Sequence, residues 1–281
     1  MFTISAFGDE ISTDLESQVR ILNELEIPGL DVRKAWGKNV LKFSDEDANQ
    51  VRQICDDHAI SIPCLGSPVG KSPLTDPIQN ELNNLARLYQ LADILGTRNI
   101  RIFSFYPDDT STNSHYDQHL DETVERLSQM AESAQKHGFV LLLENEKGIV
   151  GDTVSRCRAL MADVQNDYLR FLWDPANFVQ VGEDQVTVDG WPLLSEYIGY
   201  IHIKDATLAD KRVCPAGEGD GQIAQLLTHL KASGYEGTLS LEPHLASAGH
   251  SGGYSGPDGI KVAVGALRKV MAETGCEEDR P

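Results

Sequence analysis

Four residues with metal-binding side chains each stand at the end of a short, apolar run that favours a β-strand. They are Glu144, Asp174, His202 and Glu242, and the intervals between them are 30, 28 and 40 residues. Gly, Pro, Asp or Asn follows each of them within a few residues, which is typical of a strand that ends in a turn. Such intervals suit successive strand–helix units, so we expect neighbouring strands to deliver these side chains to one rim of a barrel.

The chemistry expected of this set is the binding of one divalent metal ion. Because residues two apart along a strand share a face, all four side chains are expected to point inward. Three carboxylates cannot crowd one rim in the ionised state without a compensating cation. Mostly oxygen ligands with a single imidazole suit Mn²⁺, Mg²⁺ or Co²⁺ better than a structural zinc, which prefers thiolates. Each acid alone would more simply cap the following helix, but four matching positions weaken that explanation.

Several further side chains are expected around a bound substrate. Arg33 and Arg101 share the inward parity near the ends of the second and fourth strands. They either hold substrate hydroxyls or a phosphate, or form buried ion pairs with rim carboxylates. Lys204 either polarises a substrate oxygen or neutralises a neighbouring glutamate. Asn177, three residues after the aspartate of the set, either reaches substrate or satisfies the backbone of a turn.

Two loops and one strand end add weaker candidates. The segment 66–72 has a superficial likeness to a phosphate-binding loop but lacks the Walker spacing, so we interpret it as a rim loop with Lys71 facing substrate. The segment 217–221 is a flexible glycine-rich loop in which Glu218 either contacts sugar hydroxyls or is simply solvated. His244 shares the inward parity of the last acid of the set and is also expected to face substrate.

Eight strand-like runs alternate with helical patterns along the 281 residues. The weakest helical pattern lies near Trp191–Tyr197. Strict alternation requires a parallel sheet, and eight repeats favour a closed α/β fold, the (β/α)₈ TIM barrel, as a single domain over residues 1–281. The runs begin near Thr3, Gly29, Ile60, Asn99, Phe139, Leu169, Ile198 and Gly237.

Composition excludes some classes of partner. The net charge is −19, from 43 acidic and 24 basic residues, and no run is rich in Lys or Arg. Because neutralised phosphates supply most nucleic-acid affinity, we expect no DNA or RNA ligand. No apolar stretch approaches the ~20 residues of a membrane helix, and the N-terminus lacks a basic leader, so we expect no membrane association. Five cysteines without a C-x-x-C pair favour a reducing, cytoplasmic location.

The motifs around these residues resemble those of the xylose isomerase-like TIM-barrel superfamily, in its sugar phosphate isomerase/epimerase branch. The likeness spans nearly the whole chain and rests on Leu-Leu-Glu-Asn, Trp-Asp-Pro-Ala-Asn, Ile-His-Ile-Lys-Asp, Gly-Glu-Gly-Asp-Gly and Ser-Leu-Glu-Pro. It implies that Glu144, Asp174, His202 and Glu242 bind one divalent ion, and that the two glutamates flank the substrate as acid and base. Similar epimerases commonly have a His where this chain has Asn177, a departure that bears on the substrate rather than the metal.

The activity that this resemblance implies is isomerisation or epimerisation of a small-molecule carbohydrate, a sugar phosphate or a keto-sugar through a cis-enediolate. One glutamate would remove the proton beside the carbonyl and the other would return it. A dehydratase of the inosose or dehydroshikimate type would use the same intermediate and expel a hydroxyl. A non-catalytic sugar-binding barrel is a further alternative. Related barrels often form homodimers or homotetramers, and the sequence leaves open the sugar, the native metal and the oligomeric state.

Overall fold

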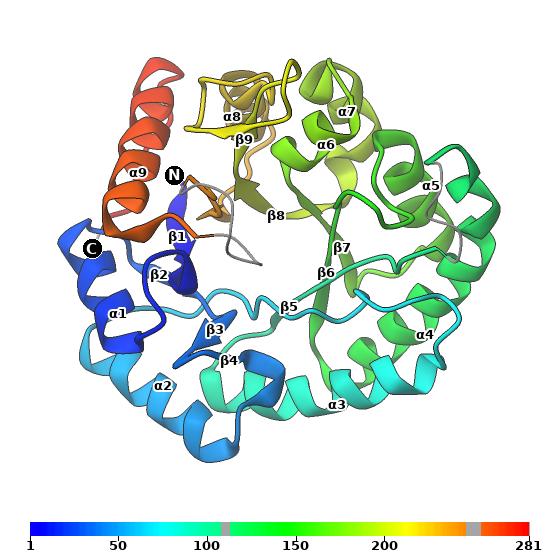
Figure 1. The fold of residues 1–281 in the computed structure, drawn as a ribbon, viewed down its shortest axis with the longest axis horizontal. Helices are drawn as coiled ribbons and strands as arrows, with labels where there is room; N and C mark the ends of the chain where they lie inside the picture. The colour runs from blue at the N-terminus through cyan, green and yellow to red at the C-terminus, as the bar shows by residue number, and fades with distance from the viewer. Residues whose placement is uncertain (108–112, 246–253, 281) are drawn as a thin grey trace.

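Seven parallel strands form a curled sheet inside a ring of helices (Figure 1). The computed structural model describes residues 1–107, 113–245 and 254–280. Each neighbouring pair of strands is parallel, in the order β2-β1-β11-β8-β7-β6-β5, as the alternation of strands and helices predicts. The strands are β1 (Thr3–Phe7), β2 (Gly29–Asp31), β5 (Asn99–Ile102), β6 (Val140–Glu144), β7 (Leu169–Trp173), β8 (Ile198–Ile203) and β11 (Thr238–Leu241).

An irregular segment completes the barrel where the strand near Ile60 was predicted. Residues 61–65 lie between the two edge strands of the sheet: Ser61 forms an isolated parallel bridge to β2, and Leu65 forms bridges to Val32, directly after β2, and to β5. Pro63 has no backbone N–H, which helps to explain why this segment forms isolated bridges rather than a continuous ladder. All eight predicted strand positions of the barrel are therefore filled, seven by regular strands and one by this irregular segment. The architecture is the predicted (β/α)₈ TIM barrel.

Nine α-helices surround the strands in the described ranges, and they follow one another around the ring from α1 to α9 (Figure 1). Local signals set their ends: Ser44 and Asp47 form a capping box at the start of α2, and Gly96 ends α3 in the left-handed conformation. No helix in these ranges is long and apolar enough to cross a membrane. The helices are α1 (Leu15–Glu24), α2 (Asp45–Asp57), α3 (Ile78–Leu95), α4 (Leu120–His137), α5 (Val154–Val164), α6 (Pro175–Val181), α7 (Val186–Leu194), α8 (Ile223–Ala232) and α9 (Gly256–Glu273).

Short hairpins and 3₁₀ helices lie in the connections between the main strands and helices. Two small antiparallel hairpins follow β2 and β8, one built from β3 (Lys34–Ala35) and β4 (Lys38–Asn39), the other from β9 (Asp205–Ala206) and β10 (Val213–Cys214). Short 3₁₀ helices occur in rim connections at Gly8–Glu10, Val40–Lys42 and Asn113–His119, and at the opposite end before β8 at Ser195–Tyr197.

Two helices follow β7, where the sequence predicts a single weak one. The predicted range Trp191–Tyr197 covers only the end of α7 and the following 3₁₀ turn. Gly190 and Pro192 lower the helical propensity of α7, which accounts for its weak signal. Gly190 is required by packing, because a Cβ at this position would lie 2.8 Å from the ring of Trp173.

Alternate residues of each strand face the helices and the barrel interior, as the parity argument predicts. In β6, Leu141 and Leu143 pack in the large core between sheet and helices, whereas Leu142 packs with Tyr200 of β8 in a second, smaller cluster. The same alternation carries the next inward residue of each strand to the rim, where the predicted ligands stand.

A buried carboxylate lies among the inward-facing residues beneath the rim. Asp31 accepts hydrogen bonds from the hydroxyls of Ser5 at 3.1 Å, Tyr200 at 2.8 Å and Ser240 at 2.7 Å. Burial raises the pKa of Asp31, and the three hydroxyl donors oppose that shift. Tyr200 and Ser240 precede rim residues of their strands by two positions, so this network forms the floor under the candidate site.

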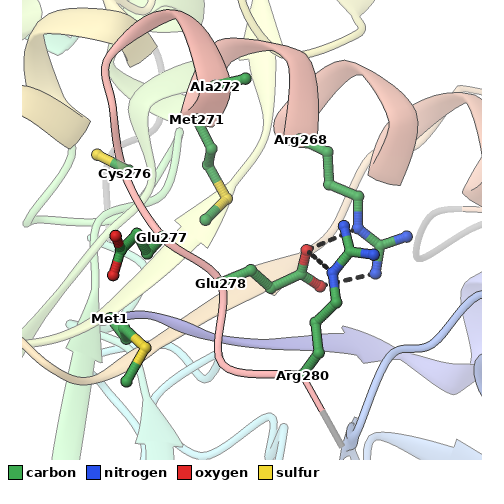
Figure 2. A pocket seen from close by; sticks show the side chains of 8 residues that line it. All are labelled: Met1, Arg268, Met271, Ala272, Cys276, Glu277, Glu278 and Arg280. Atoms are coloured by element: carbon green, nitrogen blue, oxygen red, sulfur yellow. Dashed lines mark hydrogen bonds and ion pairs between the residues drawn. The ribbon is translucent and has the colours of Figure 1, made fainter.

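The two ends of the chain meet in a cavity of 380 Å³ (Figure 2). Its walls come from the start of the chain, the end of α9 and the segment after it. Figure 2 shows Glu278 between Arg268 and Arg280, with ion pairs of 2.7 and 3.0 Å. Catalytic sites of TIM barrels form at the carboxyl ends of the strands, and this cavity adjoins the amino end of β1, so we interpret these ion pairs as structural.

Candidate metal centre and active site

The four predicted ligands meet at the carboxyl ends of four adjacent strands. Glu144 is the last residue of β6, Asp174 follows β7, His202 lies in β8 and Glu242 follows β11. At most 3% of each residue is exposed. One possible ligand atom from each lies within 4.8 Å of the others. The fold therefore gathers residues that are up to 98 positions apart in the chain into one buried cluster.

The geometry of this cluster fits a single divalent ion. Ligands about 2.1 Å from an ion stand at most about 4.2 Å apart, so the four side chains need only a small contraction. His202 Nδ1 faces the carboxylates, 3.1 Å from Glu144 Oε1 and 3.5 Å from Glu242 Oε2. Glu144 Oε2 and Asp174 Oδ2 form ion pairs but accept no hydrogen bond from the described residues. Buried oxygens with that unused capacity suit a bound cation.

Buried cations of the chain contact the same carboxylates. Lys204 Nζ lies 2.7 Å from Asp174 Oδ2 and 3.3 Å from Glu242 Oε2. Arg101 Nη1 lies 3.1 Å from Glu144 Oε2 and 3.5 Å from Glu242 Oε1. The ion-pair alternative is thus the arrangement seen for both residues. Arg101 contacts both glutamates, so it is also well placed to contact a substrate held between them.

Sequence reasoning missed two acids after β1, the partly buried Asp9 and the fully buried Glu10. Arg33 Nε lies 2.8 Å from Asp9 Oδ2, and its Nη2 lies 3.2 Å from Glu10 Oε1. Arg33 Nη1 reaches Glu242 Oε1 at 2.5 Å, while His244 Nε2 lies 3.1 Å from Glu10 Oε1. The four ligands were predicted because each is a polar residue at the end of an apolar run. A mainly apolar run at residues 4–7 also precedes Asp9 and Glu10, so the same signal could have located them.

Two asparagines fix the ends of β6 and β7 relative to each other. The side chain of Asn145 donates to Asp174 O and accepts from Asp174 N, both at 2.9 Å. Asn177 Nδ2 donates to Asn145 O at 2.8 Å and to Glu144 Oε1 at 3.4 Å. Asp174 Oδ1 accepts from Asn177 N at 3.0 Å, so this aspartate caps α6 and still directs Oδ2 at the cluster. Asn177 therefore serves the turn and also contacts a predicted ligand.

The glycine-rich loop before α8 folds around Asp205. The carboxylate of Asp205 accepts hydrogen bonds from the backbone N–H groups of Gly217, Gly219 and Gly221 at 2.9, 3.1 and 2.9 Å. A Cβ on Gly219 would lie 2.5 Å from a backbone oxygen, so the close approach requires glycine. Glu218 is exposed and lines a different cavity, of 550 Å³. Its contact with a substrate therefore stays a prediction.

A cavity of 430 Å³ borders the ligand cluster and is lined by both glutamates. Four of the predicted substrate-binding residues line it, whereas Lys204 and Asn177 do not and contact the ligands instead. Five lining residues are lysine or arginine and three are glutamate. The lining consists of Arg33, Lys34, Asn39, Gly66, Pro68, Lys71, Arg101, Phe103, Glu144, Glu146, Lys147, Glu242 and His244.

Burial and charge pull the protonation of the ligands in different directions. Burial raises the pKa of Asp174 to about 6, although Lys204 opposes this shift. Burial also disfavours the charged form of Glu144, but His202 and Arg101 outweigh it and lower the pKa of Glu144 to about 2. Burial disfavours the imidazolium form of His202, yet the neighbouring glutamates raise its pKa to about 9. Without a bound metal ion, the imidazole of His202 is therefore protonated at neutral pH.

A family model described as xylose isomerase-like TIM barrel matches residues 19–270. The chain belongs to this family. Among curated proteins, an uncharacterised protein of Methanocaldococcus jannaschii is 26% identical over 126 residues. That match covers 44% of this chain and 43% of the relative, so the chain spans less than half the length of the relative.

Solved structures with the same fold include several xylose isomerase-like barrels. A fusion protein of such a barrel with 4-hydroxyphenylpyruvate dioxygenase has a TM-score of 0.75 at 18% identity, over 97% of this chain and 43% of the fusion. A D-tagatose 3-epimerase-like protein has a TM-score of 0.76 at 16% identity, over 98% of both chains. A probable 3-DHS dehydratase from Bacillus anthracis has a TM-score of 0.71 at 19% identity, over 95% of this chain and 99% of that one. At these identities the likeness shows the shared fold.

In this xylose isomerase-like barrel, metal binding is expected to release about one proton per chain near pH 7.5. The ion needs a neutral imidazole, and the pKa of His202 is raised to about 9 in its absence. Apparent affinity should therefore rise as pH increases, by about tenfold per unit from pH 6 to 9. Calorimetric titration of metal-free protein with Mn²⁺ in buffers of different ionisation enthalpy measures the proton count. Binding without proton release at pH 7.5 would contradict a site that includes His202.

Proposed function

We propose that this barrel is a divalent-metal-dependent isomerase or epimerase of a small carbohydrate, a sugar phosphate or a keto-sugar. The observation that carries the proposal is the buried set of three carboxylates and one imidazole beside a polar cavity large enough for a sugar. Structural relatives that include a D-tagatose 3-epimerase-like protein support this reaction class. Mn²⁺ is the proposed ion, and Mg²⁺, Co²⁺ or Zn²⁺ would suit the same ligands less specifically.

The proposed chemistry places Glu144 and Glu242 on either side of a bound α-hydroxy carbonyl. When bound, a divalent ion would polarise the carbonyl and stabilise the negative charge that develops after proton removal. One glutamate removes the proton from the carbon beside the carbonyl, and the other delivers a proton to the opposite face or to the neighbouring carbon. Arg101 Nη1, close to both glutamates, is proposed to hold a substrate oxygen between them.

The surrounding residues are proposed to orient the substrate. Arg33, Lys71 and His244 line the cavity and present donors to substrate oxygens. Lys204 and Asn177 are proposed to act mainly by holding the ligands, because they already contact Asp174 and Glu144. This division would make the first three residues the stronger determinants of substrate affinity.

The experiment that tests this function combines metal analysis with hydrogen exchange. Purified protein is analysed for bound metal, loaded with Mn²⁺ and incubated in D₂O with ketoses, keto-acids and inososes. About one ion per chain, with deuterium incorporated at a carbon next to a carbonyl, is the expected result. Protein that binds no ion, or that exchanges no proton in any compound of the panel, would contradict the proposal and favour a sugar-binding role.

A dehydratase is the second candidate. A structural relative described as a probable 3-DHS dehydratase supports it, and so does His244, an imidazole on the cavity wall close to the two proposed acid–base glutamates. A nearby imidazole would protonate a departing hydroxyl. The same exchange assay separates the two reactions, because a dehydratase product is lighter than its substrate by one water, whereas an isomer or epimer keeps its mass.

The cellular setting is also a proposal. All five cysteines are free in the structure, which supports a reducing location such as the cytoplasm. Homodimers or homotetramers remain the expected assemblies, and sedimentation analysis of the purified chain would distinguish them from a monomer.

A further inference from the structure

A ladder of alternating cations and phenyl rings runs along one side of the active-site cavity, and all its members except the buried Phe7 line that cavity. Arg33 lies over the ring of Phe7 at 4.5 Å, and Arg101 lies over the same ring at 5.0 Å. Arg101 also lies over Phe103 at 4.9 Å, and Lys71 Nζ lies 4.1 Å from the centre of that ring. The negative faces of the two rings thus hold three cations in a row. The row begins at Arg33, which contacts Glu242, and ends at Lys71.

The outer end of this ladder is held by the backbone of the rim loop. Phe103 N donates to Val69 O at 2.9 Å, and Phe105 N donates to Gly70 O at 2.8 Å. Gly70 has a φ of +83°, and a Cβ there would lie 2.0 Å from Phe103 O, so only glycine permits this approach. Lys71 is therefore presented from a fixed position next to Phe103. The segment 66–72, which only superficially resembles a phosphate loop, serves to place this lysine.

The cavity is more positive than the rest of the chain. Its lining has five Lys or Arg residues against three Glu, whereas the whole chain has 24 against 43. Two of the three glutamates are proposed ligands, whose charge a divalent ion would offset. The third, Glu146, lies 3.1 Å from Lys71 Nζ and 3.6 Å from Lys147 Nζ, so one carboxylate faces two lysines. A loaded site would hold uncompensated positive charge at its outer end.

We propose that the substrate carries a carboxylate or phosphate group, which Lys71 binds at the outer end of the ladder while the α-hydroxy carbonyl lies between the two glutamates. This inference rests on the proposed function and narrows its substrate to anionic carbonyl compounds. The mild repulsion from the net charge of −19 acts at long range and is screened by salt, whereas the ladder acts on contact.

The test compares matched neutral and charged compounds. A three-carbon series consists of dihydroxyacetone, dihydroxyacetone phosphate and hydroxypyruvate. A six-carbon series consists of D-fructose, D-fructose 6-phosphate and D-fructuronate. Dissociation constants are measured calorimetrically on the Mn²⁺-loaded protein, and exchange in D₂O is measured in parallel. In at least one series a charged member should bind tenfold or more tightly than the neutral one, and the preferred member shows whether the group is a phosphate or a carboxylate.

Lys71→Met should weaken the preferred charged compound about tenfold, and by a clearly larger factor than it weakens the neutral one. Lys231→Met is the matched control, because it also removes one positive charge. Lys231 lies in α8, donates to Gly275 O and does not line the rim cavity. No charge preference in either series, or equal weakening of charged and neutral compounds by Lys71→Met, would overturn the inference. Exchange without charge preference would refute this inference alone, and charge preference without exchange would refute the proposed reaction alone.

Discussion

Replacing Glu242 with glutamine is expected to lower proton exchange at least a thousandfold while the barrel stays folded. Glutamine preserves the size of the side chain and an oxygen for the ion, but it cannot accept the substrate proton. A positioned acid or base contributes about 10²–10⁴-fold to rate, and loss of a ligand carboxylate adds to that. Initial rates of deuterium incorporation in Mn²⁺-loaded protein, with metal content determined on the same samples, measure the effect.

The matched control for this variant is Glu236→Gln. Glu236 is an exposed acid just before β11. It lies at the amino end of this strand, whereas Glu242 lies at its carboxyl end. Its replacement should leave exchange within a factor of two. Exchange by Glu242→Gln at the wild-type rate would remove this residue from the proposed chemistry. A parallel variant, Glu144→Gln, tests whether both glutamates carry protons, because a purely metal-binding role would be rescued by a higher Mn²⁺ concentration.

Much of the candidate site was predictable because strand periodicity and barrel topology both act on residues at strand ends. A polar residue that ends an apolar run in a parallel barrel lies at one rim, and this rule located Glu144, Asp174, His202 and Glu242 together. The rule needs no knowledge of side-chain conformation.

Other parts depend on contacts between distant segments, which carry no local pattern. The segment at residues 61–65 has little regular strand pairing, because Pro63 interrupts its hydrogen bonding. The end of this segment therefore could not be assigned from side-chain periodicity alone. The order of cations and rings along Arg33, Phe7 and Arg101 depends on closure of the barrel, which brings β5 close to β1 and to the residues that follow β2. No spacing along the chain encodes that order.

The glycine-rich loop has a structural role that its sequence motif did not predict. Its glycines indicated a flexible loop in which Glu218 either contacts sugar hydroxyls or is solvated. In the structure those glycines bring backbone N–H groups onto Asp205, the residue after Lys204. Asp205 thus ties this loop to the strand end that also presents Lys204 to the cluster of predicted metal ligands. The motif is explained by this backbone contact, whether or not Glu218 contacts a substrate.

Replacing Arg33 with methionine is expected to lower the free energy of unfolding by about 3–5 kcal/mol at pH 7, since it leaves several buried carboxylates without their shared cation. Arg33 is 6% exposed and contacts Asp9, Glu10 and Glu242 at 2.5 to 3.2 Å. Methionine fills similar volume but supplies no charge. Chemical denaturation of metal-free protein, followed by circular dichroism, measures the loss. Arg20→Met, which removes an exposed pair with Glu24, should cost no more than about 0.5 kcal/mol.

The pH dependence of this loss identifies its cause. Without Arg33, the buried carboxylates should have pKa values above those of the unfolded chain, so the folded state binds protons more strongly. The stability deficit relative to wild type should then shrink as the pH falls from 7 towards 5. Mn²⁺ should also restore part of it, because the ion compensates Glu242 but not Asp9. A deficit that is constant with pH and insensitive to Mn²⁺ would show that Arg33 contributes through packing rather than charge.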